Sequence, residues 1–258
     1  MADVNFHICC WIGRHIIDDL LGSIAKAMVG RANTASVQPS QMNSVFQRSN
    51  LEGKLLNLVT ELNQKEELQD GLLKAIVSGE MMSVERKYDD VREIEPFAKH
   101  IILTNHLPRI SDYSDGLFRR VSIIPLQRQF LGNAADPLLI TKLTWELDAI
   151  TSRALDALGR LIDRQGNFTE PPICTAAKST WRSDNNHIMQ YLAERVYKAP
   201  SASVSVQAMY DDYRNWFAST GLRGQLGRKQ FANRVEAADI AKSSRRSQGY
   251  FFMNVNLR

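Results

Sequence analysis

Apolar and polar positions in the first half of the chain follow a pattern that predicts strands separated by helices. Three short runs are almost entirely apolar, which is typical of buried strands, and they cover residues 54–61, 99–105 and 121–125. Apolar residues at helical spacing predict helices over residues 18–29 and 70–77. Strands that alternate with helices favour an α/β fold with a mainly parallel sheet covered on both faces.

The pattern becomes purely helical after Pro137. Apolar residues recur at steps of three and four from Ile140 to Leu161, which predicts one long helix or two close ones packed beside the sheet domain. The pair Pro171-Pro172 ends this region and marks a candidate linker. Trp145 and Trp181 lie on apolar helical faces, so we expect both side chains to pack in a core.

The last part of the chain predicts a compact module. Residues 206–217 place apolar side chains on one face of a helix, with Ser205 as its N-cap. A glycine-rich turn leads to a second helix, in which Phe231 and Val235 point into the module. A basic stretch and an aromatic run over residues 250–255 follow. Helix, glycine turn, helix and basic hairpin form the order of a winged helix-turn-helix.

The composition is that of a globular protein and excludes a disordered or membrane-spanning one. Of the 258 residues, 44% are hydrophobic and 23% charged, and no stretch approaches the roughly 18 consecutive apolar residues of a membrane helix. The chain has three cysteines, two of them adjacent, which suits no disulfide framework. A cluster of His7, Cys9, Cys10 and His15 matches no zinc signature, so we expect no metal site. We expect a cytoplasmic protein.

Positive charge is concentrated at the C-terminal end. The whole chain has a formal charge of +4, but residues 185–258 carry eleven basic and five acidic side chains, a net charge of +6. A basic end on a near-neutral body is typical of a nucleic-acid-binding appendage, although a solvated basic face with no partner also produces an excess of this size.

Polar side chains close two of the predicted strands. Glu61 and Asn105 end buried strands, and the carboxyl ends of strands in a doubly wound sheet line the ligand crevice. Arg119 and Arg120 come just before the third strand. Phosphoryl transfer needs an acid that orients water near a metal, an amide that senses a phosphate and an arginine that neutralises developing charge. Each residue alone is more commonly a solvated strand cap or a surface charge.

The order of these residues and their surroundings carry a resemblance to a known family. Residues 20–130 resemble the helicase domain of the phage and plasmid primase-helicases, a superfamily 3 group of AAA+ ATPases that includes poxvirus and satellite-phage replication proteins. The stretches that match are VQPSQ (37–41), FQR (46–48), GKLLNLVTE (53–61), LKAIVSGE (73–80), TNHLP (104–108) and SDGLFRR (114–120).

The resemblance implies a role for each of these residues. Glu61 would be the Walker B glutamate, Asn105 the sensor, and Arg119 or Arg120 the finger that reaches a neighbouring subunit's nucleotide. The segment from Lys74 to Tyr88, with Arg86 and Lys87, would form a hairpin that contacts DNA. The family uses ATP and magnesium, binds DNA, assembles as a homo-oligomeric, hexamer-like ring, and is bacterial or phage-encoded with no membrane association.

The C-terminal module resembles, more loosely, the winged helix that often follows this helicase domain. The resemblance implies DNA contacts from cations of its second helix and of its hairpin, with the three helix cations along one side. These residues are Arg228, Lys229, Arg234, Lys242, Arg245 and Arg246.

The chain departs from the family at the phosphate-binding loop. An ungapped alignment places the loop Gly-x-x-x-x-Gly-Lys-[Ser/Thr] on residues 8–15, where only Gly13 matches. Arg14 would replace the phosphate-cradling lysine, and His15 would replace the magnesium-ligating hydroxyl. The chain's one Gly-Lys pair, Gly53-Lys54, belongs to a predicted strand. The strand and primase region that should come before the loop are absent in this interpretation.

Two explanations of the N-terminal segment stay open. Residues 1–17 are either a start read in another frame and joined to an intact family body, or a loop that has diverged in a chain that works without ATP. In both cases we expect no tight nucleotide binding by this chain, unless an intact partner supplies the loop.

The sequence therefore favours a superfamily 3 DNA helicase/ATPase module of a phage or mobile-element replication primase-helicase, impaired in ATP hydrolysis. The alternative is a non-enzymatic DNA-binding or assembly protein that keeps the helicase fold and the winged helix. The expected parts are an incomplete AAA+ (P-loop NTPase-like) core over 1–136, a helical lid over 137–170, a linker helix over 171–196 and the winged-helix module over 197–258.

Overall fold

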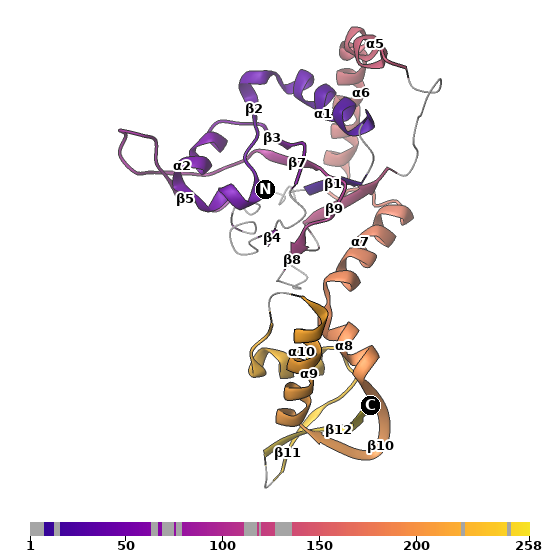
Figure 1. The fold of residues 1–258 in the computed structure, drawn as a ribbon. Helices are drawn as coiled ribbons and strands as arrows, with labels where there is room; N and C mark the ends of the chain where they lie inside the picture. The colour runs from indigo at the N-terminus through magenta and orange to yellow at the C-terminus, as the bar shows by residue number, and fades with distance from the viewer. Residues whose placement is uncertain are drawn as a thin grey trace. The chain divides into compact units, whose positions relative to one another are not determined.

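The protein is a mixed α/β chain of two compact units, Met1–Arg182 and Ser183–Arg258, in a computed structural model (Figure 1). Among the residues that the structure describes, no helix is long and apolar enough to cross a bilayer. The described residues are 8–12, 16–62, 67–68, 75, 79–110, 118, 120–126, 136–222, 225–246 and 249–258.

A five-stranded sheet is the centre of the first unit. Its strands lie in the order β2-β3-β7-β1-β9, and every neighbouring pair is parallel. The three predicted apolar runs are confirmed as β3, β7 and β9. The strands are β1 (Ile8–Ile12), β2 (Thr34–Ala35), β3 (Leu56–Val59), β7 (Lys99–Leu103) and β9 (Val121–Pro125).

Shorter elements and helices surround this sheet. Two small sheets pair β4 with β8 in parallel and β5 with β6 in antiparallel. The predicted helix over 70–77 lies outside the described residues except for Ala75, which is helical. The elements are α1 (Ile16–Val29), η1 (Arg31–Asn33), η2 (Pro39–Asn43), α2 (Val45–Arg48), η3 (Ser49–Leu51), β4 (Glu67–Leu68), β5 (Met82–Val84), β6 (Arg92–Ile94), β8 (Arg109–Ile110), α5 (Leu139–Trp145), α6 (Leu147–Asp163) and α7 (Pro172–Asn185).

Helix α1 packs very closely on one face of the sheet. A Cβ atom at Gly22 would lie 2.8 Å from Leu103 Cδ1 and 3.3 Å from Leu58 Cδ2. A larger residue at this position would require the Leu103 and Leu58 side chains to shift, so glycine allows the helix backbone to lie this close to β3 and β7. The apolar side chains that meet here, with Leu56 and Ala25, form a small core beneath the helix.

A buried polar pair organises the opposite face of the same two strands. The amide oxygen of Asn57 accepts a hydrogen bond from the Val37 backbone N–H at 2.7 Å, and its nitrogen donates to the Val37 carbonyl at 3.0 Å. The same nitrogen lies 3.0 Å from His100 Nδ1, on the paired residue of β7. Burial lowers the pKa of His100 to about 3, with a smaller contribution from Lys99. The neutral imidazole is therefore the form that accepts from Asn57.

The predicted helical region over 140–161 consists of two helices, α5 and α6, and neither buries a residue. Trp145 is 81% exposed, so the prediction that it packs in a core is wrong. The described part of the chain provides no element that covers this side of α5. Trp181 of α7 is 2% exposed, as predicted, and its indole N–H donates to the Pro108 carbonyl at 2.9 Å.

The described residues of the second unit form three helices and a three-stranded antiparallel sheet in the order β10-β12-β11. The predicted helix, glycine turn, helix and hairpin are all present, and Ser205 Oγ accepts the N-cap hydrogen bond from Ala208 N as predicted. The unit begins before 197, because α8 contributes core side chains. The elements are α8 (His187–Arg195), β10 (Val196–Ser205), α9 (Val206–Thr220), α10 (Arg228–Ala237), β11 (Ser243–Arg246) and β12 (Gly249–Leu257).

An aromatic cluster is the core of the second unit. The Tyr213 ring stacks on Phe231 with centroids 4.7 Å apart, and it contacts Tyr191 of α8 edge-on at 5.4 Å. Phe252 of β12 meets Phe231 edge-on. All of these rings except Phe252 lie on the three helices, so aromatic packing joins α8, α9 and α10 to one another and to the sheet.

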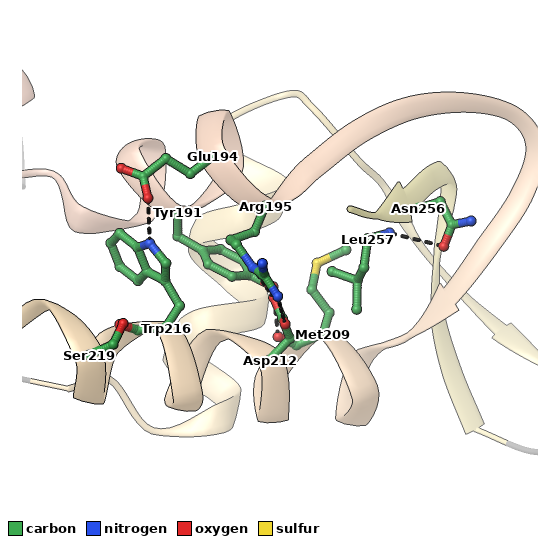
Figure 2. Close-up of polar contacts among 9 residues, drawn as sticks. All are labelled: Tyr191, Glu194, Arg195, Met209, Asp212, Trp216, Ser219, Asn256 and Leu257. Atoms are coloured by element: carbon green, nitrogen blue, oxygen red, sulfur yellow. Dashed lines mark hydrogen bonds and ion pairs between the residues drawn. The ribbon is translucent and has the colours of Figure 1, made fainter.

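Polar contacts between α8 and α9 reinforce this core (Figure 2). The Asp212 carboxylate accepts from Arg195 Nη2 at 2.6 Å and Nε at 3.2 Å, and from the Tyr191 hydroxyl at 3.1 Å. One turn further along α9, the Trp216 indole N–H donates to Glu194 at 2.7 Å. Asp212 thus pairs with the Arg195 guanidinium, and Glu194 binds the Trp216 indole, so both acidic side chains are engaged within the unit.

We predict that Asn57→Ala destabilises the sheet of the first unit. The Val37 N–H and C=O would lose their buried partners, at a cost of about 1–3 kcal/mol for each group left unpaired. Hydrogen exchange should accelerate by about tenfold or more in peptides that cover β2, β3 and β7. Asn105→Ala, at an exposed asparagine, is the matched control and should leave these rates unchanged. Equal protection in both variants would contradict this role of Asn57.

We predict that acid destabilises the second unit through His187, which is 6% exposed. Burial, and secondarily Arg234, lowers its pKa from 6.5 to about 4. The unfolded chain therefore binds this proton between pH 6.5 and 4 while the folded unit does not, so stability is complete above pH 6.5 and decreases down to pH 4. Urea titrations followed by the near-ultraviolet signal of the aromatic cluster should detect this slope. His187→Phe should reduce the slope and His106→Gln should retain it; an unchanged slope in His187→Phe would exclude His187 as its source.

Candidate functional site

The structure brings Glu61 and Asn105 to the same edge of the central sheet. Glu61 follows the end of β3 by two residues, and Asn105 follows the end of β7 by two residues. The two strands are parallel neighbours, with Val59 opposite Ile102. Both side chains are exposed at the carboxyl ends of these strands, where open α/β sheets bind ligands.

Local hydrogen bonds hold the backbone of both positions. Gln38 Nε2 donates to the Glu61 carbonyl at 3.1 Å. The Thr104 hydroxyl donates to the His106 carbonyl at 2.8 Å and accepts from the His106 N–H at 3.2 Å, which closes a tight turn around Asn105. The carboxylate of Glu61 is therefore displayed from a fixed backbone, and so is the amide of Asn105.

Arg120 lies at the opposite edge of the sheet. It precedes β9, whose first residue, Val121, pairs with Ile8 at the start of β1, while the carboxyl ends Pro125 and Ile12 pair with each other. Five residues of strand span about 16 Å. Within one copy of the chain, Arg120 and the pair Glu61–Asn105 are thus separated by the length of the strands. Arg119 lies outside the described residues.

The residues aligned with the phosphate-binding loop do not form a loop along their whole length. Residues 8–12 are strand β1, between β7 and β9, so the interpretation that this strand is absent is wrong. Three residues, 13–15, connect β1 to α1; they include the candidates Gly13, Arg14 and His15 and lie outside the described residues.

The Gly53-Lys54 pair is at the amino end of β3, away from the ligand edge. Gly53 has φ +67° in the turn that precedes the strand. Lys54 Nζ donates to the Ala32 carbonyl at 2.5 Å, so its ammonium holds the neighbouring loop. This lysine therefore does not act as the phosphate-cradling lysine of the edge that carries Glu61 and Asn105.

A hairpin projects from β5 and β6 within the segment expected to contact DNA. Met82 pairs with Ile94 and Val84 with Arg92, and residues 85–91 form the connection. Arg86 donates to Glu52 at 3.0 Å, and Lys87 Nζ lies 5.0 Å from the centroid of the Tyr88 ring. Lys74 lies outside the described residues.

Tyr88 is an exposed aromatic residue of this hairpin connection. Its side chain is 92% exposed and its φ is +71°, a conformation that non-glycine residues seldom adopt. Sequence reasoning included Tyr88 only as the end of the hairpin segment. The exposed aromatic and cationic side chains together suit contact with nucleic acid bases and phosphates.

A polar hollow of about 390 Å³ lies beside β2, the edge strand of the sheet. Glu52 lines it and binds both Arg86 at 3.0 Å and Arg92 at 2.5 Å. Because β2 and the residues before β3 line the hollow, it is separate from the carboxyl edge that carries Glu61 and Asn105.

The cations of α10 do not lie along one side, contrary to the sequence expectation. Phe231 and Val235 are fully buried, as predicted. Arg228 and Lys229 are exposed, but Arg234 is partly buried on the flank that faces His187, whose pKa it helps to lower. Helical geometry separates positions 228 and 234 by about 120° around the axis.

Cations also mark the β11–β12 hairpin. Lys242 and Arg245 are exposed, and Arg245 lies directly opposite Tyr250 in the antiparallel register. The backbone of Arg246 pairs with that of Gly249. Tyr250 is 57% exposed and shares a strand face with Phe252, which packs against α10. The Arg245–Tyr250 pair therefore extends from the sheet face that α10 covers.

In the described part of the chain, no three His, Cys, Asp or Glu side chains form a metal-binding group. His7 and His15 of the cluster considered in the sequence lie outside the described residues, and Cys9 and Cys10 belong to β1.

Comparisons with known proteins show what the chain is similar to. The model of a family of unknown function, DUF5906, matches residues 16–120, from the start of α1 to Arg120. "Putative helicase 022R" of Frog virus 3 (isolate Goorha) is 20% identical over 186 residues, 66% of this chain and 19% of that protein. The apo structure of the NrS-1 C terminal region has a TM-score of 0.50 and 15% identity, over 92% of this chain and 53% of that one. The chain is therefore similar in sequence to part of a viral protein named as a putative helicase and similar in fold to the NrS-1 region, and it spans only a part of each protein.

Proposed function

We propose that this chain is a superfamily 3 helicase module of a phage or mobile-element replication protein, that it binds duplex DNA through its second unit, and that it does not hydrolyse ATP alone. The resemblance of residues 20–130 and the similarity to a viral protein named as a helicase support the first part. The placement of Glu61 and Asn105 at one ligand-binding edge supports it further.

The arrangement of the second unit carries the DNA-binding part of the proposal. Its order of helix, strand, two helices and a hairpin, with β12 between β10 and β11, is the arrangement expected of a winged helix. In this interpretation α10 is the helix that enters the major groove and the β11–β12 hairpin is the wing.

The charges of the second unit support a DNA-facing side. Asp212 and Glu194 are engaged with Arg195 and Trp216 between α8 and α9. Lys229 on α10, with Lys242 and Arg245 near the wing, is exposed. Part of the unit's positive charge is thus available around α10 and the wing, where phosphates flank a groove-bound helix.

The short connection between β1 and α1 supports impaired ATP hydrolysis. A phosphate-binding loop needs several consecutive backbone N–H groups, a lysine and a hydroxyl, and residues 13–15 supply Gly, Arg and His. ATP and Mg²⁺ would therefore require a loop from a partner chain. The same observation favours the second candidate, a non-enzymatic DNA-binding or assembly protein. An ATPase assay in the presence of a partner chain with an intact phosphate-binding loop separates the two, because only a helicase module would raise the partner's turnover.

We predict no DNA-stimulated ATPase activity above background for the purified chain, since the β/γ-phosphate cradle and a magnesium ligand are both missing. Turnover is measured with Mg²⁺ and single- or double-stranded DNA. The matched control is Glu61→Gln, which should behave as the wild type does. A turnover of about 1 per second or faster that disappears in Glu61→Gln would overturn this part of the proposal.

We predict salt-dependent binding of duplex DNA by the full chain, at micromolar to hundred-micromolar strength for arbitrary sequences. The double variant Lys242→Ala/Arg245→Ala should flatten the logarithmic salt slope by about two units, one for each phosphate-binding cation that is removed.

The control for that variant removes the same charge elsewhere. Arg153→Ala/Arg160→Ala removes two exposed cations of α6 and should keep the wild-type slope. Equal slopes in both double variants would assign the effect to net charge and contradict the wing. If DNA binding is measured on the isolated second unit, the fragment should start at Ser183 and not at 197, because α8 supplies Ile188 and Tyr191 to the core.

A further inference from the structure

Helix α10 presents two amide side chains on the face turned away from its core. Phe231 and Val235 are buried, whereas Gln230 and Asn233 are exposed. Positions 230 and 233 are three residues apart, so they lie on the same face of the helix about one turn apart. Lys229 flanks them and is also exposed.

The neighbouring polar side chains of α10 are engaged within the unit. Arg228 donates to Gln207 Oε1 at 2.5 Å, and Gln207 in turn binds the carboxylate of Asp211. Glu236 accepts from the Ser243 N–H and hydroxyl at the start of β11. Within the described residues, neither the Gln230 side chain nor the Asn233 side chain forms a hydrogen bond with another protein group.

Amides in this position match one particular edge of DNA. The major groove admits an α-helix, and an Asn or Gln amide there pairs with adenine by accepting from N6 and donating to N7. The stacking of Tyr213 on Phe231 fixes α10 from behind, so both amides are carried by a rigid element.

We propose that Gln230 and Asn233 read adenine bases in the major groove and give this chain a preference for sites with A·T pairs at defined positions. This inference rests on the proposed binding of duplex DNA by the second unit. Lys229, Lys242 and Arg245 supply affinity from phosphates, and the two amides supply the choice of sequence.

The experiment is a selection of binding sites from a random duplex pool with the full chain. The wild type should enrich sites with fixed A·T pairs. Gln230→Ala/Asn233→Ala should lower affinity for the selected site by about tenfold or more while affinity for a scrambled site stays the same. Both residues are exposed, so a melting curve identical to that of the wild type is expected and confirms that the variant is folded.

An atomic substitution in the DNA makes the test specific. When 7-deazaadenine replaces adenine at a selected position, N7 is removed as an acceptor, so the wild type should bind more weakly. The double variant should bind the modified and unmodified sites equally, since the two changes eliminate the same hydrogen bond.

The outcomes separate this inference from the function on which it rests. If the wild type shows no salt-dependent binding of duplex DNA, the proposed function fails. If it binds but enriches no sequence, or if the double variant keeps the wild-type preference, the assignment of Gln230 and Asn233 is wrong and DNA binding stands. Lys242→Ala/Arg245→Ala should weaken binding to every site and retain the preference.

Discussion

The position of α10 depends on Tyr213. Its ring stacks on Phe231 at 4.7 Å, and its hydroxyl accepts from the Leu226 backbone N–H at 3.2 Å in the turn that leads into α10. The same hydroxyl lies 3.4 Å from His187 Nδ1 at the start of α8. The fully buried Tyr213 side chain thus contacts the turn before α10, the buried face of α10 and the start of α8. It therefore positions the helix whose outer face we assign to DNA. Burial raises the pKa of the Tyr213 hydroxyl, so it remains a neutral phenol.

Much of the fold was predictable where a simple physical rule applied along a continuous segment. Strand β9 has the predicted bounds, and β3 and β7 lie inside the predicted runs, because buried parallel strands consist mostly of apolar residues. Helix α9 and its Ser205 cap followed from apolar spacing and cap chemistry. Strand β1 was missed because its residues were aligned with a loop by the position of α1, although a run such as Ile8–Ile12 is apolar.

The rest of the structure depends on contacts that a sequence pattern does not contain. Asn57 interrupts an apolar run, and nothing in the sequence shows that its amide binds the Val37 backbone and meets His100. Trp145 was predicted to be buried because it lies on an apolar helical face, but an apolar face is buried only where another element packs on it. The common location of Glu61 and Asn105 could be predicted from the sequence, since the carboxyl ends of parallel strands lie at one edge of the sheet. Gln230 and Asn233 were missed because counting charges gives no weight to neutral amides.

The parallel register of the central sheet has a consequence for symmetry. Glu61 and Asn105 follow the carboxyl ends of strands, and Arg120 precedes the amino end of β9. In one copy these groups face opposite edges, so a single bound molecule meets all three only when the amino edge of one copy approaches the carboxyl edge of another. Such a contact joins two different surfaces and has no two-fold axis, unlike the self-complementary interface of an ordinary dimer. Each interior copy of such an assembly uses both edges, and only the two terminal copies keep one free edge each until the contacts close into a ring. If the rotation between copies does not close, the same contact produces an open filament.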